Sequence, residues 1–165
     1  MPGKVIKLEQ LKALRKRWKK QGKKLVFTNG CFDLIHIGHI RYLRRAKAMG
    51  DYLVVGLNSD RSVRKIKGEK RPIMSEKERG EILASLWFVD YVVIFQEQTP
   101  ERIIKSLEPD YLVKGADWGI ERIVGAKEVL SWGGKVKRIK LTAGRSSSGI
   151  IERIVKRYSE SKNAL

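Results

Sequence analysis

The chain has few of the residues from which disulfide frameworks and metal centres are built. Its 165 residues include one cysteine, Cys31, and two histidines, His36 and His39. A single cysteine excludes an internal disulfide framework and is typical of a reducing cytoplasm. Together, the cysteine and the histidines supply fewer ligands than a structural zinc site of the usual kind requires. We therefore predict a cytoplasmic protein that has no metal site of its own.

Long apolar runs are also missing. No run approaches the roughly 18–20 residues of a membrane-spanning helix, and the longest, such as residues 91–95, have the length of strands. The N-terminus is charged from Lys4 onward and lacks the apolar centre of a secretory signal. The chain is 42% hydrophobic, which is enough to build a core. We predict one domain without a transmembrane segment, in which a basic N-terminal helix (1–22) precedes the core (23–158) and a tail (159–165).

Acidic residues are outnumbered by basic ones. The 36 lysines and arginines exceed the 18 aspartates and glutamates, which gives a net charge of +18. An excess of this size favours polyanionic partners such as nucleotides, sugar phosphates, nucleic acid or an anionic membrane surface. The cations gather in residues 1–24, 61–71 and 135–157. We interpret the first cluster as solvated surface and the second as a phosphate-binding segment.

Apolar strands alternate with amphipathic helices along the chain. Strands are predicted at residues 24–28, 52–57, 90–95, 110–113 and 135–140, and helices at residues 8–20, 38–49, 75–86, 99–107, 121–131 and 147–158. Residues 58–74 are polar, show no periodicity and are predicted as a loop. The alternation predicts an α/β fold, a single Rossmann-like doubly wound domain with a mainly parallel five-stranded sheet. Ligands of such folds bind beyond the carboxyl ends of the strands.

The two histidines lie where the first of these strands gives way to a helix. Unpaired N–H groups and the helix dipole favour an anion at such a helix start. The spacing places His36 and His39 on one face of the first turn, and Gly38 between them leaves the backbone approachable. This pattern predicts a phosphate site. The alternatives are histidines that cap the helix or pack in the core, and a metal pair for which Asp33 is the nearest third ligand.

Residues 30–33, Gly-Cys-Phe-Asp, followed by residues 36–39, His-Ile-Gly-His, resemble the HxGH motif of the cytidylyltransferase-like nucleotidyltransferases. Further stretches resemble one branch of that superfamily, the heptose 1-phosphate adenylyltransferases. They are residues 28–33, residues 112–118 with 123–125, and residues 133–136 with 144–151. The resemblance covers about residues 23–158, with the motifs in order.

The resemblance implies a nucleotidyltransferase that transfers AMP from ATP to D-glycero-β-D-manno-heptose 1-phosphate, giving ADP-heptose for lipopolysaccharide biosynthesis. Mg²⁺ would accompany the ATP. In the family this activity is often fused to a sugar kinase, and we expect a separate heptose kinase here. One alternative is a cytidylyltransferase that uses CTP and glycerol 3-phosphate or a related alcohol phosphate. Another is a basic nucleic-acid-binding module, although we expect no obligate nucleic acid partner. The apolar strand edges and the N-terminal helix are compatible with a homodimer.

The same resemblance implies roles for single residues. His36 and His39 would contact the triphosphate and stabilise the charge that develops at the α-phosphorus. Lys67, with Lys65 and Lys70 as alternatives, would hold the acceptor phosphate or the leaving pyrophosphate, and Arg79 would reach phosphate from its helix. The residues implied in nucleotide binding are Thr28, Asn29, Gly30, Phe32, Gly38, Lys114, Gly115, Asp117, Ser146, Ser147 and Ser148.

Some of these residues also have a structural interpretation. Asp33 either orients the histidine loop or stabilises a turn. Arg79 is the family's phosphate-binding arginine or an ordinary surface arginine. Residues 146–148 bind phosphate, cap the last helix, or do both. Arg145 stands where relatives often carry a small or apolar residue, and it either contacts phosphate or faces outward. Cys31 is interpreted as a small buried residue.

Overall fold

A parallel β-sheet forms the centre of the computed structural model, which describes residues 4–116, 119–142 and 144–160. Its six strands lie in the order β1-β4-β3-β2-β5-β6. The strands are β1 (Lys4–Val5), β2 (Leu25–Gly30), β3 (Tyr52–Asn58), β4 (Tyr91–Phe95), β5 (Tyr111–Gly115) and β6 (Lys135–Ile139). The helices are α1 (Leu8–Lys20), α2 (Ile37–Lys47), α3 (Asp60–Lys67), α4 (Glu76–Ser85), α5 (Glu101–Leu107), α6 (Ala126–Ser131) and α7 (Ser147–Glu160), with a 3-10 helix η1 (Ile120–Arg122). Of these described helices, none is long and apolar enough to cross a membrane. The predicted α/β fold with a parallel sheet is confirmed.

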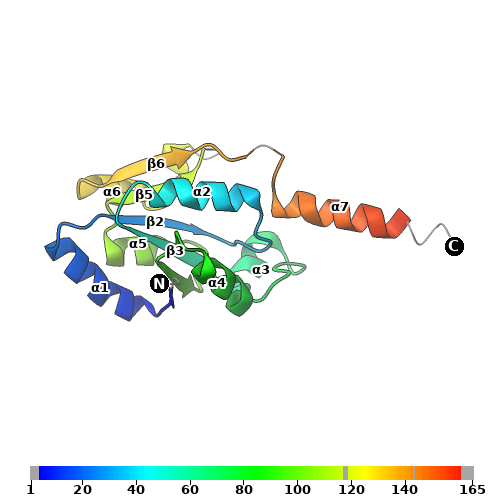
Figure 1. Cartoon of the computed structure of the whole chain (residues 1–165), viewed down its shortest axis with the longest axis horizontal. Coiled ribbons are helices and arrows are strands. Elements are labelled where there is room, and N and C mark those ends of the chain that lie inside the picture. Colours follow the sequence, from blue (N-terminus) through cyan, green and yellow to red (C-terminus); the bar gives the residue numbers. More distant parts are fainter. Residues whose placement is uncertain (1–3, 117–118, 143, 161–165) are drawn as a thin grey trace.

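Helices cover both faces of the sheet, because the central strands carry apolar side chains on both sides. In β2, Val26 packs in a cluster with α2 and α4, whereas Leu25 and Phe27 pack in a second cluster with α1, α5 and α6. All three side chains are fully buried. Such strands are typical of a parallel sheet enclosed between two helical layers. Figure 1 shows α1 and α7 at opposite ends of the molecule, with α7 extending beyond the sheet.

The structure differs from the predicted elements at three places, and at the first two, residues 4–5 and 121–131, the local pattern is weak. The sheet has six strands and not five, because β1 adds a two-residue strand that pairs with β4. A strand this short carries no periodicity that a sequence pattern could show. The helix predicted at residues 121–131 is divided into η1 and α6. Gly125, with φ of 83°, adopts a left-handed conformation between them, which a continuous helix does not allow.

The segment predicted as a loop at residues 58–74 contains a helix, α3. Ser59 caps it by accepting a hydrogen bond from the N–H of Ser62, and Gly68 ends it with φ of 92°. Both residue types are usual at these positions. The helix was missed because only two apolar residues, Val63 and Ile66, fall within it, too few to show a helical period.

One cation of the N-terminal cluster holds α1 to the rest of the molecule. Arg15 is only 6% exposed and donates hydrogen bonds to the carbonyl oxygens of Leu107 and Glu108, at the end of α5. It also forms an ion pair of 3.0 Å with Asp110. A cation at a helix C-terminus compensates the partial negative charge there. The interpretation of this cluster as solvated surface is therefore wrong for Arg15, which is structural.

The connections place a crevice between β2 and β5. From β2 the chain proceeds to β3 and β4 on one side, then crosses over to β5 and β6 on the other. β2 and β5 are thus neighbours whose connections leave in opposite directions, and ligands of doubly wound sheets bind at the carboxyl ends of such strands. These ends are residues 29–30 and 114–115.

Two glycines offer a matched test of the packing of this sheet. A Cβ at Gly56, in β3, would lie 2.8 Å from Cζ of Phe27, whereas one at Gly80, in α4, would meet Cγ2 of Val5 at an ordinary 3.5 Å. We expect Gly56→Ala to lower the free energy of unfolding by ~1–3 kcal/mol, and Gly80→Ala to raise it by ~0.5–1 kcal/mol because alanine is the better helix former. Urea denaturation measures both changes. An unchanged stability of the first variant would contradict the close approach of Phe27 to β3.

Candidate active site

Two adjoining cavities open at the carboxyl ends of β2 and β5. The first, of about 280 Å³, lies beside the start of α2 and is called here the α2 lobe. The second, of about 520 Å³, extends toward α3 and is called the α3 lobe. The residues that line both lobes are Asn29, Gly30, Cys31, Phe32, His39, Lys114, Ser146 and Ser147. The two lobes therefore meet at a shared wall, at the crevice between β2 and β5.

His36 begins α2 as its N-cap. Its Nδ1 accepts a hydrogen bond of 3.1 Å from the N–H of Gly38. A Cβ at Gly38 would lie 2.9 Å from both Nδ1 and Cε1 of His36, so this contact needs glycine. Because Nδ1 is an acceptor, the proton of the neutral imidazole is on Nε2, which can donate to a ligand. His36 thus both caps the helix and lines the α2 lobe.

The turn before α2 places an aromatic ring beside His39. Phe32 has φ of 44°, a left-handed conformation that is uncommon for residues other than glycine. Its ring is 6% exposed and lies 5.1 Å from the ring of His39. A Cβ at Gly30 would approach Cε2 of Phe32 to 3.0 Å. Burial of the ring offsets the backbone strain, and such strain is common at functional sites.

The two imidazoles stack on each other, with ring centroids 3.9 Å apart. Burial, and then the nearby His36, lower the pKa of His39 from its ordinary 6.5 to about 4. Burial and the positive charge of Arg145 also lower the pKa of His36. Lowered pKa values favour the neutral forms, so His39 at neutral pH is an uncharged hydrogen-bonding group.

Two buried polar atoms in the shared wall have no hydrogen-bond partner among the described residues. They are Oδ1 of Asn29 and Nδ1 of His39. Leaving such atoms unpaired is costly, and an unpaired atom in a cavity wall indicates a place where a ligand or water completes the bonding. The structure therefore brings Asn29 and His39 together, as predicted, in a wall with unused hydrogen-bonding capacity.

Thr28 does not line either lobe, although it was predicted in the nucleotide cleft. Its side chain is fully buried, and its hydroxyl is 2.7 Å from that of Tyr42, which donates to the carbonyl oxygen of Val113. Thr28 points into the core because alternate residues of a strand face opposite ways. It connects β2 to α2 and, through Tyr42, to β5.

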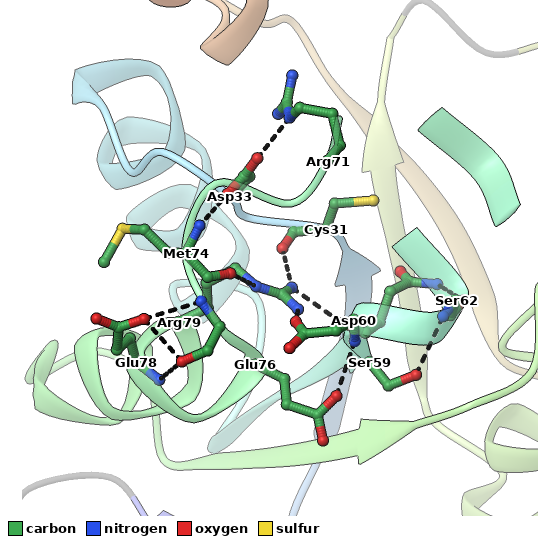
Figure 2. Close-up of polar contacts among 12 residues, drawn as sticks. Cys31, Asp33, Ser59, Asp60, Ser62, Arg71, Met74, Glu76, Glu78 and Arg79 are labelled. Carbon is green, nitrogen blue, oxygen red and sulfur yellow. Dashed lines mark hydrogen bonds and ion pairs between the residues drawn. The ribbon is translucent and has the colours of Figure 1, made fainter. Parts of the chain in front are cut away.

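Arg79 is the clearest departure from the predicted site. Its side chain is 0% exposed, and it lines neither lobe. Its guanidinium donates to the carbonyl oxygens of Met74, Cys31 and Asn58 and forms an ion pair of 2.7 Å with Asp60 (Figure 2). The predicted contact with phosphate does not fit this position, because protein oxygens surround the guanidinium. Arg79 instead joins the ends of β2 and β3 to the starts of α3 and α4.

Asp33 joins the histidine loop, which it was predicted to orient, to the segment before α4. Its buried carboxylate accepts hydrogen bonds from the N–H groups of Ile73 and Met74 and from Nε of Arg71 (Figure 2). Burial alone would raise the pKa of Asp33, but the two N–H groups and the Arg71 guanidinium hold it below its ordinary value. The carboxylate is therefore ionised and fixes residues 71–74 against the histidine loop.

The α3 lobe is lined by cations from several elements. Lys67, in the last turn of α3, lines this lobe, whereas its alternatives Lys65 and Lys70 line neither lobe. Arg71 and Arg122 line it too. Sequence reasoning named neither arginine as a site residue, although Arg71 belongs to the cluster 61–71 that was interpreted as a phosphate-binding segment. This cluster was the only available signal.

The start of α7 closes the site from the C-terminal side. Ser146 accepts a hydrogen bond from the N–H of Gly149, and Ser147 donates to the carbonyl oxygen of Leu34, both at 3.0 Å. Ser147 lines both lobes, and Ser148 lines the α3 lobe. Arg145 lines the α2 lobe and has no hydrogen-bond or ion-pair partner among the described residues. Whether it contacts phosphate stays a prediction.

The end of β5 supplies the opposite edge of the shared wall. Lys114 lines both lobes and Gly115 lines the α2 lobe, and both were predicted in nucleotide binding. Asp117, also predicted in nucleotide binding, lies outside the described residues, as does Trp118.

Comparison with protein-family models identifies one match over most of this chain. Residues 27–153, which include the histidine loop and the start of α7, match the cytidylyltransferase-like family. Among curated proteins, the bifunctional protein HldE of Geobacter metallireducens is 52% identical over 157 residues, and that of Geobacter sulfurreducens is 50% identical over 157 residues. The aligned region is 95% of this chain but 32% of each relative, so the chain spans about a third of their length.

Solved structures show the same fold. The lipopolysaccharide core biosynthesis protein from Thermoplasma volcanium GSS1 is 29% identical with a TM-score of 0.59, over 73% of this chain and 98% of that one. Pantoate-beta-alanine ligase from Francisella tularensis has a TM-score of 0.61 over 88% of this chain and 69% of that one. Its 16% identity shows the fold alone.

Because the chain has only two histidines, NMR can follow the titration of each imidazole. In the free protein we expect His39 to remain neutral until about pH 4. An anion beside the ring favours the protonated imidazole, so bound pyrophosphate should raise the pKa of His39. At a pH between the pKa of the free protein and that of the complex, binding of pyrophosphate should therefore take up protons. A midpoint near 6.5 for His39 in the free protein would contradict the burial described above.

Proposed function

Because the chain belongs to the cytidylyltransferase-like family of nucleotidyltransferases, we propose that it transfers AMP from ATP to D-glycero-β-D-manno-heptose 1-phosphate, giving ADP-heptose and pyrophosphate. The main support for this type of reaction is the pair of lobes that meet at His39. A transfer between two anionic substrates needs such a junction, with hydrogen-bond donors and cations placed around it.

Similarity supports the choice of heptose as acceptor. The chain resembles the heptose 1-phosphate adenylyltransferases in residues 28–33, 112–118 and 144–151. HldE proteins match it at about 50% identity, and a lipopolysaccharide core biosynthesis protein is among the similar solved structures. ADP-heptose is a precursor of that core.

The α2 lobe fits the nucleotide. The positive ends of the helix dipoles at the starts of α2 and α7 are suited to phosphate oxygens, and Arg145 adds a cation beside His36. Mg²⁺ would arrive as MgATP. Among the described residues no group of three or more histidine, cysteine or acidic side chains could hold a metal ion, so phosphate oxygens and waters would hold the magnesium.

The α3 lobe fits the acceptor phosphate, which Lys67 would hold. An oxygen of that phosphate attacks the α-phosphorus in line, the bond to the oxygen that bridges to the β-phosphate breaks, and pyrophosphate leaves. No covalent intermediate forms. A phosphate dianion is already a nucleophile at neutral pH, so no general base is needed. The neutral histidines donate hydrogen bonds to the oxygens that gain charge.

A substrate matrix tests the proposal. Pyrophosphate release is measured with MgATP and MgCTP, each combined with heptose 1-phosphate, other sugar 1-phosphates and glycerol 3-phosphate. We expect the highest kcat/KM for MgATP with the heptose. A preference for CTP with glycerol 3-phosphate would replace the proposal with the cytidylyltransferase alternative.

The role of His39 is tested by His39→Ala. Losing one positioned donor typically costs ~10²–10³-fold in turnover, so we expect a loss of this size. Circular dichroism checks that the fold is kept. Arg44→Ala, an exposed cation on the same helix, is the matched control and should retain full turnover. Near-normal turnover of His39→Ala would remove His39 from the mechanism.

A further inference from the structure

Arg71 is held at one end of its guanidinium only. Its Nε donates to Oδ2 of Asp33, and the pair is almost buried, with side-chain exposures of 16% for Arg71 and 0% for Asp33. No other hydrogen bond of the guanidinium is found among the described residues. In Figure 2 the outer end of the guanidinium points away from Asp33. The two Nη groups are therefore available, in a residue that lines the α3 lobe.

Asp33 cannot easily turn away from this contact. Its oxygens also accept hydrogen bonds of 2.8–3.0 Å from the N–H groups of Ile73 and Met74. These bonds fix the plane of the carboxylate and, through it, the direction of the arginine. Arg79 fixes the same segment from the other side, because it donates to the carbonyl oxygen of Met74. The arginine is thus pre-oriented before any ligand binds, which lowers the entropic cost of binding.

A second cation lies close to the same point. Lys67 lines the α3 lobe together with Arg71. Burial raises the pKa of the Cys31 thiol, and the positive charges of Lys67, Arg79 and Arg71 act against this increase. Lys67 and Arg71 are thus both near enough to Cys31 to act on it electrostatically. An ammonium group and a guanidinium fork that converge on one cavity are suited to a phosphate group.

We propose that Arg71 binds the phosphate of the acceptor through its two Nη groups and that Asp33 is its positioning residue. The proposal rests on the proposed function and deepens it, since it assigns the α3 lobe to a phosphomonoester. A planar fork can bind two oxygens of the phosphate while the third remains free to attack the α-phosphorus. Lys67 supplies the remaining charge.

Kinetics separate this role from a purely structural one. For Arg71→Ala we expect the KM for heptose 1-phosphate to rise about 10- to 100-fold, the effect of losing charged hydrogen bonds, while the KM for MgATP changes little. Arg71→Lys, which keeps the charge without the fork, should recover only part of the loss. Arg44→Ala, an exposed arginine of α2 that lines neither lobe, is the control and should behave as wild type.

A double-mutant cycle tests the positioning role of Asp33. Asp33→Asn keeps the size of the side chain and removes its charge, and we expect it to raise the KM for the acceptor but not for MgATP. In combination with Arg71→Ala it should add little, because Asp33 acts through Arg71. Additive effects, or equal rises of both KM values, would show that Asp33 serves the fold and would overturn its positioning role.

A binding assay makes the inference independent of turnover. Cys31 is the only cysteine of the chain and lines the α3 lobe, so its alkylation by iodoacetamide reports occupancy. Inorganic phosphate should slow alkylation in the wild type and in Arg44→Ala, but much less in Arg71→Ala. If phosphate protects through Arg71 while heptose 1-phosphate is not a substrate, the proposed function fails and the inference stands. The inference is overturned if heptose 1-phosphate reacts and Arg71→Ala leaves the KM for it unchanged. It is also overturned if phosphate protects Cys31 equally well in the wild type and in Arg71→Ala.

Discussion

The buried guanidinium of Arg79 is the contact on which the geometry of the site depends. It donates hydrogen bonds to the backbone just after β2, at the end of β3 and just before α4, and it is neutralised by Asp60 at the start of α3. A buried cation is tolerated only when it is paired and fully bonded. Each of these segments is therefore bound to the same guanidinium. Three of them, the segment after β2, the end of β3 and helix α3, also contribute residues to the wall of the α3 lobe.

A second buried ion pair, between Asp33 and Arg71, extends this arrangement to the cavity itself. The two pairs share the loop after β2 and the segment before α4. The pair of Arg79 and Asp60 lines neither lobe, whereas Arg71, in the second pair, lines the α3 lobe. Cations that are gathered around one site repel one another. Internal anions are therefore needed to hold them in place. Asp33 and Asp60 serve this purpose, and both belong to the minority of acidic residues in a strongly basic chain.

The sequence was informative where the signal is local. Continuous apolar runs predicted the parallel sheet, and the HxGH segment placed both histidines correctly at the start of α2. Arg79 could not be interpreted from its position, because helix periodicity does not distinguish an arginine at the surface from one that is enclosed by loops. The pair of Asp33 and Arg71 is separated by 38 residues, and no pattern in either segment indicates the contact. The short helix α3 was missed because capping residues, and not apolar periodicity, define it.

The order of the strands also affects how copies of the chain meet at high concentration. The sheet has two open edges, β1 and β6. β1 is only two residues long, and β6 carries Lys135, Lys137 and Arg138 within five residues. Short edge strands and repeated cations both oppose pairing between sheets of different molecules. The short β1 and the cations of β6 thus both protect the sheet against edge-to-edge aggregation.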